Sequence, residues 1–341
     1  MTDSVPGYIG QSVPRREDKK LLLGQGLFVA DIQLPDMLHV AIARSQLPHA
    51  RIMAIDLSAA QNAEGVELAV SGKDILDHLP PISGMQLAAP PGYRDRVDTD
   101  ILIPDQPLIP HEKVRFVGEP YALVVADSRH LAEDALELIE ADFDLLPPVT
   151  GPDDALDETS VLLHEQLGRN IAALMHTKKG KGAKALETAP HRLKRRFTVH
   201  RYAAMPMECR GVVADYNTRT DTLTIWSSTQ VVHWVRREVA NSLGMPEENV
   251  RCIAPDVGGG FGGKGHVYPE DILIAYLARR LQRPVKWIED RHEHILNSTH
   301  SRDNVFDVEV GFDNISLSRN SHHSKLDATS KVGKQTPNIF A

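Results

Sequence analysis

The chain has 341 residues, of which 42% are hydrophobic and 25% are charged, and its formal net charge is −8. This size and apolar content predict about two globular domains. The negative charge argues against nucleic-acid binding, and the lack of an apolar run of roughly 18 residues argues against a membrane span.

The first half of the chain begins with a polar arm, residues 1–20, which we interpret as a docking segment. The arm lacks the apolar core that precedes a signal cleavage site, so we expect a cytoplasmic protein. Residues 21–148 mix strand and helix patterns and are expected to form the first domain. The apolar runs Leu38–Ala43 and Ala122–Ala126 predict strands, and Ser128 is expected to cap a helix.

Two segments indicate irregular backbone. Residues 79–110 are rich in proline, which predicts an extended surface excursion that faces a partner subunit. Residues 149–160 combine proline, glycine and acidic residues, and they predict a linker.

The second domain is expected over residues 161–314. Asn217–Asp221 lies between two β-like runs and predicts a hairpin. An apolar stripe predicts a helix from Val231 to Leu243, and Pro269 opens another helix. A strand at Val285–Ile288 follows, so the fold class is α+β.

The end of the chain changes in character. Ser, Lys, Asn, His and Thr dominate residues 315–341 without periodicity. We interpret this tail as the aberrant end of a frameshifted or truncated chain and expect it to be disordered.

The most informative stretch is the glycine loop, Asp256–Lys264, with the sequence Asp-Val-Gly-Gly-Gly-Phe-Gly-Gly-Lys. It follows a predicted strand at Val250–Ile253. Without Cβ atoms, its amide N–H groups can closely approach an anionic or metal-bound oxygen. A flexible surface loop is the plain alternative, but glycine-rich linkers usually carry serine rather than a central aromatic residue.

Two nucleotide sites are alternatives for this loop. Gly258-x-Gly260-x-x-Gly263 matches the dinucleotide fingerprint, which has to open directly into a helix, whereas here further residues intervene before Pro269. Gly258-x-x-x-x-Gly263-Lys264 fits most of a P-loop, but the next residue is glycine instead of the serine or threonine that binds magnesium. The surrounding residues therefore favour neither nucleotide site.

Several motifs resemble, in order along the chain, those of the large subunit of molybdenum hydroxylases, the family of xanthine dehydrogenase, aldehyde oxidase and carbon monoxide dehydrogenase. Independent motifs in the family order are more specific than one glycine pattern. The resemblance implies an N-terminal α/β-hammerhead-type domain followed by the first part of a molybdopterin-binding domain. Besides the glycine loop, the motifs are Val117–Ala122, Pro206–Gly211, Ser228–Gln230, Arg283–Trp287 and Ser298–Asp303.

The resemblance also implies a cofactor and partners. The cofactor would be molybdopterin, as Mo-molybdopterin or its cytosine dinucleotide form, in an oxidoreductase that hydroxylates a small molecule with oxygen from water. Electrons would pass to 2Fe-2S clusters on an iron–sulfur small subunit and to FAD on a medium subunit. The only two cysteines, Cys209 and Cys252, are too few for a cluster that takes about four thiolates, so this transfer needs another subunit.

Individual roles follow from the same resemblance. Gln230 matches the glutamine whose amide donates a hydrogen bond to a molybdenum oxygen. Gly259, Gly260, Phe261 and Gly262 match the loop beside the metal, where the aromatic ring walls the substrate pocket. The plain alternatives are an ordinary strand-end glutamine and a structural aromatic wedge.

Gly265 stands where purine-oxidising relatives place a substrate-binding glutamate. A glycine cannot anchor a purine, so the expected substrates are aldehydes, small heterocycles or carbon monoxide. The resemblance places the base glutamate and the second cofactor domain beyond residue 341. We therefore assign no catalytic residue, expect no side chain to bind metal directly, and expect half of a site.

Other polar residues receive structural roles. We expect an ion pair between Glu208 and Arg210. We expect His292, Glu293 and His294 to form a polar helix surface, because residues i and i+2 point apart on a helix.

Three functions stay open at this point. The first is a fragment of a molybdenum hydroxylase large subunit, incomplete by itself. The second is a non-catalytic truncated remnant or assembly module, and the third is a nucleotide-binding protein.

Overall fold

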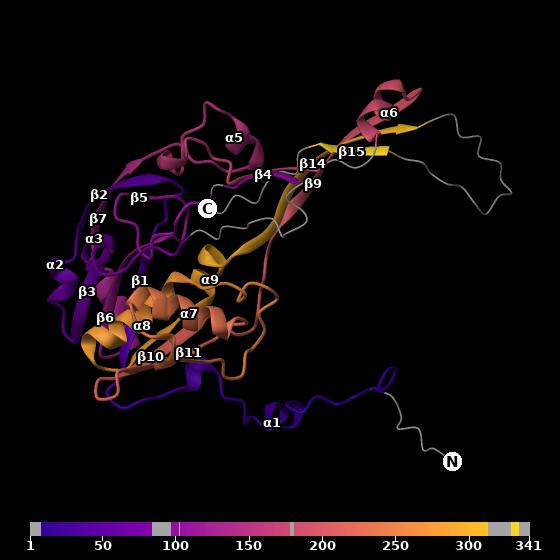
Figure 1. Cartoon of the computed structure of the whole chain (residues 1–341). Helices are drawn as coiled ribbons and strands as arrows, with labels where there is room; N and C mark the ends of the chain where they lie inside the picture. Colours follow the sequence, from indigo (N-terminus) through magenta and orange to yellow (C-terminus); the bar gives the residue numbers. More distant parts are fainter. Residues whose placement is uncertain (1–7, 84–96, 102, 178–180, 313–328, 334–341) are drawn as a thin grey trace, which may run out of the picture.

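The computed structural model describes residues 8–83, 97–101, 103–177, 181–312 and 329–333 (Figure 1). These residues form an α+β fold around a seven-stranded sheet. The strand order is β12 (Val250–Ile253), β11 (Thr222–Ser227), β10 (Gly211–Asn217), β13 (Val285–Ile288), β1 (Leu38–Arg44), β6 (Pro120–Ala126) and β3 (Val66–Ser71).

The large sheet takes strands from both parts of the sequence. β1 pairs in parallel with β13, with Leu38 opposite Val285, and antiparallel with β6. The two expected domains therefore share one sheet and one main hydrophobic core. The limits of these two domains, 21–148 and 161–314, stay a prediction from the sequence.

Helices cover both faces of this sheet, which explains its apolar strands. On β6, Leu123 and Val125 enter the core beneath α7 and α8, whereas Val124 and Ala126 pack with α2 and α4 on the other face. A strand that is buried on both faces has a continuous apolar run. The four helices are α2 (Ser58–Gln61), α4 (Arg129–Leu136), α7 (Val232–Leu243) and α8 (Pro269–Leu281).

Three smaller sheets complete the strands. In Figure 1 the long β9–β14 ribbon leaves the body and reaches toward α6. The sheets are β5 (Lys113–Val114), β2 (Ala50–Asp56) and β7 (Glu140–Leu145); β4 (Val97–Ile101) and β8 (Ala173–Thr177); and β15 (Thr329–Gly333), β14 (His300–Phe312) and β9 (His191–Ala203).

The other helices in the described ranges are short. Neither they nor the longer ones are long and apolar enough to cross a membrane. They are α1 (Asp18–Leu22), α3 (Gly72–Ile75), α5 (Pro152–Leu156), α6 (Gly182–Thr188) and α9 (Arg291–Asn297), with 3-10 turns η1 (Val29–Asp31), η2 (Glu165–Leu167) and η3 (Glu247–Asn249).

A buried charge and a close backbone contact join the two parts. Arg44 of β1 donates to Glu270 Oε1 at 2.8 Å and to Glu293 Oε1 at 2.9 Å. Gly118 has a φ of 99° and lies so close to α9 that a Cβ would be 2.7 Å from the Leu296 carbonyl oxygen. Glycine is therefore required where the start of β6 meets α9.

Most of the predicted elements are confirmed. The predicted strands are β1, β6, β12 and β13, and the hairpin joins β10 to β11. The helix expected from Val231 is α7, and α8 starts at Pro269. The Ser128 hydroxyl caps α4 by accepting from Leu131 N at 3.3 Å.

The irregular segments differ from expectation. Leu79, Leu108 and Ile109 of the proline-rich segment are buried in the main core, so its ends are not a surface excursion. Its residues 84–96 and 102 lie outside the described residues. The expected linker contains α5.

The two chain ends are described only in part. Of the predicted disordered tail, Thr329–Gly333 form β15 beside β14, and the rest lies outside the described residues. Residues 8–20 of the arm are described, and Lys20 Nζ lies 2.7 Å from Asp256 Oδ1. The arm is therefore tied to the first residue of the glycine loop.

Candidate functional site

The glycine loop leaves β12 and folds into two tight turns. Gly263 N donates to Gly260 O at 2.8 Å, and Gly265 N donates to Gly262 O at 3.0 Å. Gly259 and Gly262 have φ angles of 98° and 91°. Only glycine adopts this conformation readily, so the turn itself requires the glycines.

Gln230 lies against this loop between β11 and α7. Its Oε1 accepts from Gly262 N at 3.1 Å, and its own N donates to Lys264 O at 2.9 Å. A Cβ at Gly260 would lie 2.4 Å from Gln230 Oε1, so only glycine leaves room for the carboxamide. Because Oε1 is held by the loop, Nε2 is left to donate to another group.

Three consecutive loop amides are also left as donors. Within the part of the chain that the structure describes, the N–H groups of Gly259, Gly260 and Phe261 donate to no acceptor. Successive free amides in such a turn favour an anionic or metal-bound oxygen. The five residues expected at a cofactor thus lie together, on a face where Gln230 is exposed.

Phe261 is not a buried wedge. Its side chain is 78% exposed, and its ring lies over Gly259, where a Cβ would meet it at 3.1 Å. Its φ of 51° is in the left-handed region, which an aromatic residue rarely adopts. Its role as a wall of a substrate pocket stays a prediction.

Gly265 closes the second turn of the loop. Behind the loop is a cavity of about 10 Å³ whose lining includes Arg210, Ser228 and Asp271. This volume suits about one water molecule, which is too little for a substrate. The effect of Gly265 on substrate choice therefore stays a prediction.

A buried ionic cluster lies under the loop. Lys264 Nζ is 2.9 Å from Glu208 Oε2 and 2.6 Å from Ser228 Oγ. Burial lowers the pKa of Lys264, although its hydrogen bond and charge interaction with Glu208 oppose this shift. Glu208 Oε2 also accepts from Gly258 N at 2.8 Å, whereas the buried Glu208 Oε1 has no partner among the residues that the structure describes.

The expected ion pair between Glu208 and Arg210 is wrong. Arg210 instead lies 3.1 Å from Glu270 Oε2 and donates through Nε to Glu289 Oε1 at 2.9 Å. Burial opposes ionisation of Glu289, but the charge of Arg210 and hydrogen bonds from His294 and Arg210 hold its pKa at about 2. The guanidinium of Arg210 also stacks 3.8 Å from the centre of the Tyr268 ring.

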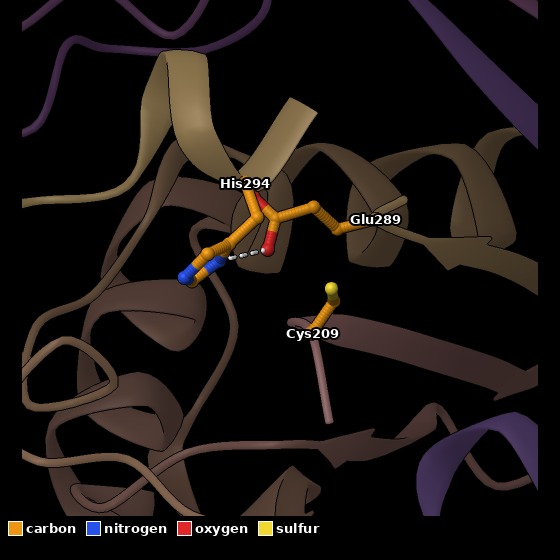
Figure 2. Close-up of side chains that lie close together, drawn as sticks. All are labelled: Cys209, Glu289 and His294. Atoms are coloured by element: carbon orange, nitrogen blue, oxygen red, sulfur yellow. Dashed lines mark hydrogen bonds and ion pairs between the residues drawn. The ribbon is translucent and has the colours of Figure 1, made fainter. Parts of the chain in front are cut away.

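Figure 2 shows a second cluster, in which Cys209 lies near the hydrogen-bonded pair of Glu289 and His294. His294 is 1% exposed, so its assignment to a polar helix surface is wrong. Its Nδ1 lies 2.8 Å from Glu289 Oε2, and its Nε2 lies 2.8 Å from Ala204 O.

The geometry of the cluster of Cys209, Glu289 and His294 favours an ion-pair network over a metal site. Arg210 already donates to both oxygens of Glu289. Burial raises the pKa of the Cys209 thiol, which disfavours the thiolate that a metal would bind. Cys209 and Cys252 are both free, so they form no disulfide with each other.

The loop geometry also disfavours both nucleotide sites. The loop closes into turns instead of opening into α8, whose first turn carries the buried carboxylates Glu270 and Asp271. Burial raises the pKa of Asp271 to about 6. A phosphate at this helix N-terminus would meet acidic groups where such sites need free amides.

The sequence interpretation missed the role of Lys264. Its position directly after the glycines was visible, but its partner Glu208 is 56 residues away in the chain. Lys264 belongs to the glycine-loop motif and Glu208 belongs to the Pro206–Gly211 motif. The presence of both motifs in the same chain was the signal that could have suggested the pair.

Comparison with known families assigns both parts of the chain. Residues 23–147 match the family described as aldehyde oxidase and xanthine dehydrogenase, a/b hammerhead domain. Residues 163–316 match the family described as molybdopterin cofactor-binding domain.

Individual relatives agree. The chain is 37% identical to the 6-hydroxypseudooxynicotine dehydrogenase complex subunit gamma of Paenarthrobacter nicotinovorans, over 90% of this chain and 37% of the relative. It is 32% identical to the carbon monoxide dehydrogenase large chain of Hydrogenophaga pseudoflava, over 86% of this chain and 36% of the relative.

A solved structure is similar as well. Quinoline 2-oxidoreductase from Pseudomonas putida 86 has a TM-score of 0.82 and 39% identity, over 90% of this chain and 38% of that one. The chain therefore spans little more than a third of the length of these proteins.

Proposed function

The chain belongs to the molybdenum hydroxylase large-subunit family, with the hammerhead domain and the first part of the molybdopterin-binding domain, and we propose that it supplies one wall of a molybdenum-cofactor site. The observation that carries this proposal is a set of free donors that lie together around the exposed residues Gln230 and Phe261. These donors are the free amides of Gly259, Gly260 and Phe261 and the Nε2 group of Gln230.

The residues of this wall fit an oxygen-bearing group. The bare backbone around Gly260 leaves the space that a Cβ would fill. Amide donors do not titrate, so they present the same hydrogen bonds at any physiological pH. When bound, the molybdenum cofactor supplies the redox chemistry by which an oxygen from water reaches the substrate.

The protein residues position that chemistry. Gln230 would donate through Nε2 while Gly262 N holds its Oε1, which fixes the direction of the carboxamide. The loop amides would donate from beside it. Phe261 would cover the substrate side with its exposed ring.

For the substrate class, the proposal rests on Gly265. Gly265 offers no side chain to a purine, so aldehydes, heterocycles and carbon monoxide are the candidates. The similar quinoline 2-oxidoreductase is named for a heterocycle. We therefore favour a small heterocycle.

Partner subunits follow from the relatives, which are named as a gamma subunit of a complex and as a large chain. An iron–sulfur subunit and an FAD subunit would carry electrons away from this chain. Further polypeptide would cover the exposed residues Gln230 and Phe261 and would carry the general base.

The test is metal and pterin analysis of the chain, purified from cells that make the cofactor, together with any subunits that copurify. Molybdenum and pterin should be present in equal amounts and should fall in a Gln230→Ala variant. Gln166→Ala, on the exposed turn η2, is the control and should retain both. A molybdenum content no higher than background, in both the wild-type chain and its complexes, would contradict the proposal.

That negative result would favour a second function, a non-catalytic assembly module. The observation behind this alternative is the exposed face together with the chain's coverage of about a third of its relatives. A module of this kind would copurify with partner subunits without the cofactor.

A further inference from the structure

Lys264 is an unusual residue to find beneath a ligand loop, because its side chain is only 1% exposed. A lysine is seldom fully buried unless it is paired. Here its ammonium group faces Glu208 Oε2 and Ser228 Oγ, at 2.9 and 2.6 Å. The charge is therefore neutralised inside the protein and is not presented to a ligand.

This one residue connects both ends of the glycine loop. Lys264 is the last residue of the loop, and through Glu208 Oε2 it reaches Gly258 N near the start, at 2.8 Å. Its carbonyl oxygen accepts from Gln230 N at 2.9 Å. The loop and the backbone of Gln230, whose carboxamide faces the loop, are thus held by the same residue.

The middle of the loop needs such a support. Phe261 holds a left-handed φ of 51°, a conformation that costs on the order of 1–3 kcal/mol for a residue other than glycine. Its ring is 78% exposed, so packing of the side chain does not hold the backbone in place. The strain has to be balanced by backbone contacts, which are the bond of Gly262 N to Gln230 Oε1, the turn within the loop and the contacts of Lys264 at its end.

We propose that Lys264 is a positioning residue, which acts through Glu208 and Ser228 to hold the glycine loop in the form that presents its three free amides beside Gln230. The nature of the ligand rests on the proposed function. The positioning itself does not, because it concerns the conformation of the loop without a ligand.

Hydrogen–deuterium exchange of the purified chain, followed by mass spectrometry, tests this role. In Lys264→Met, the peptide covering residues 256–265 should exchange about ten times faster, because the hydrogen-bonded amides of the loop open more often. Ser228→Ala removes one hydroxyl and keeps the ion pair, so it should give a smaller increase of about threefold without unfolding the chain.

Lys286→Met is the matched control. Lys286 is also buried, and its Nζ donates to Ala30 O at 2.7 Å and Ile32 O at 2.9 Å, in a part of the chain that precedes β1. This variant should lose overall stability but leave exchange of the loop peptide, relative to other core peptides, within about twofold of wild type.

The proposal is overturned if Lys264→Met and Ser228→Ala leave loop exchange unchanged, or if they accelerate all core peptides equally. The latter result would make Lys264 a general stability residue. Molybdenum content, measured on the same samples, is a separate readout. A wild-type chain without molybdenum whose loop still opens in Lys264→Met would refute the proposed function and support the positioning role.

Discussion

Gly260 is the residue at which a single added methyl group should disturb the site most directly. The methyl of Gly260→Ala would overlap Gln230 Oε1, which lies 2.4 Å from the ideal Cβ position. We expect the carboxamide to be displaced and the cofactor to bind about tenfold more weakly, or about 1.4 kcal/mol. The measurement is the amount of molybdenum that each variant and the wild-type chain retain per chain during dialysis.

Gly151→Ala is the control for this prediction. In the described ranges, the nearest atom to a Cβ added at Gly151 is Asp154 Oδ2 at 3.9 Å, so the methyl group should be tolerated there. Equal retention of molybdenum by both variants would contradict the assigned place of Gln230.

Among the elements, the contact of β6 with α9 depends on Gly118. In Gly118→Ala, the new Cβ would lie 2.7 Å from the Leu296 carbonyl oxygen, and the φ of 99° would be strained as well. We expect a loss of about 3 kcal/mol in the free energy of unfolding, measured with urea, because backbone atoms cannot move aside as a flexible side chain can.

Gly168→Ala separates the two causes. Gly168 has a φ of 66°, but no atom of the described part of the chain lies within 4 Å of an added Cβ, so only the backbone cost of about 1 kcal/mol applies. If Gly118→Ala were no more destabilising than Gly168→Ala, the close contact between β6 and α9 would not contribute to the loss of stability.

For the whole molecule, Glu119 should set part of the dependence of stability on pH. Burial raises the pKa of Glu119 to about 7, against the opposing charges of Arg115 and Lys113. Its folded pKa lies above its ordinary value of 4.5, so the folded chain binds the proton more tightly. The stability from this carboxyl is complete below about pH 4.5 and is lost as the pH rises through about 7.

Glu119→Gln should remove this loss, because glutamine stays neutral and its oxygen can still accept from Arg115 N. Between about pH 4.5 and 8, the variant should gain up to about 3 kcal/mol in unfolding free energy relative to wild type. Chemical unfolding at several pH values measures this difference. A difference that stays constant with pH would contradict the assignment.

The sequence by itself determined the fold class, the principal strands and helices, and the face that carries Gln230 and the glycine loop. These features depend on local patterns, such as apolar periodicity, the proline that starts α8 and glycines at positive φ. Residues close together in the chain largely determine such patterns, and the ordered motifs indicated the family.

The tertiary structure alone decided which charges pair. Glu208 pairs with Lys264, 56 residues away, and Arg210 pairs with Glu289, 79 residues away, so the neighbouring Glu208 and Arg210 do not pair with each other. The same holds for His294, which is buried because α9 packs beneath the loop segment at Ala204. Partners of buried charges depend on which strands lie side by side, and no local pattern in the chain encodes that neighbourhood.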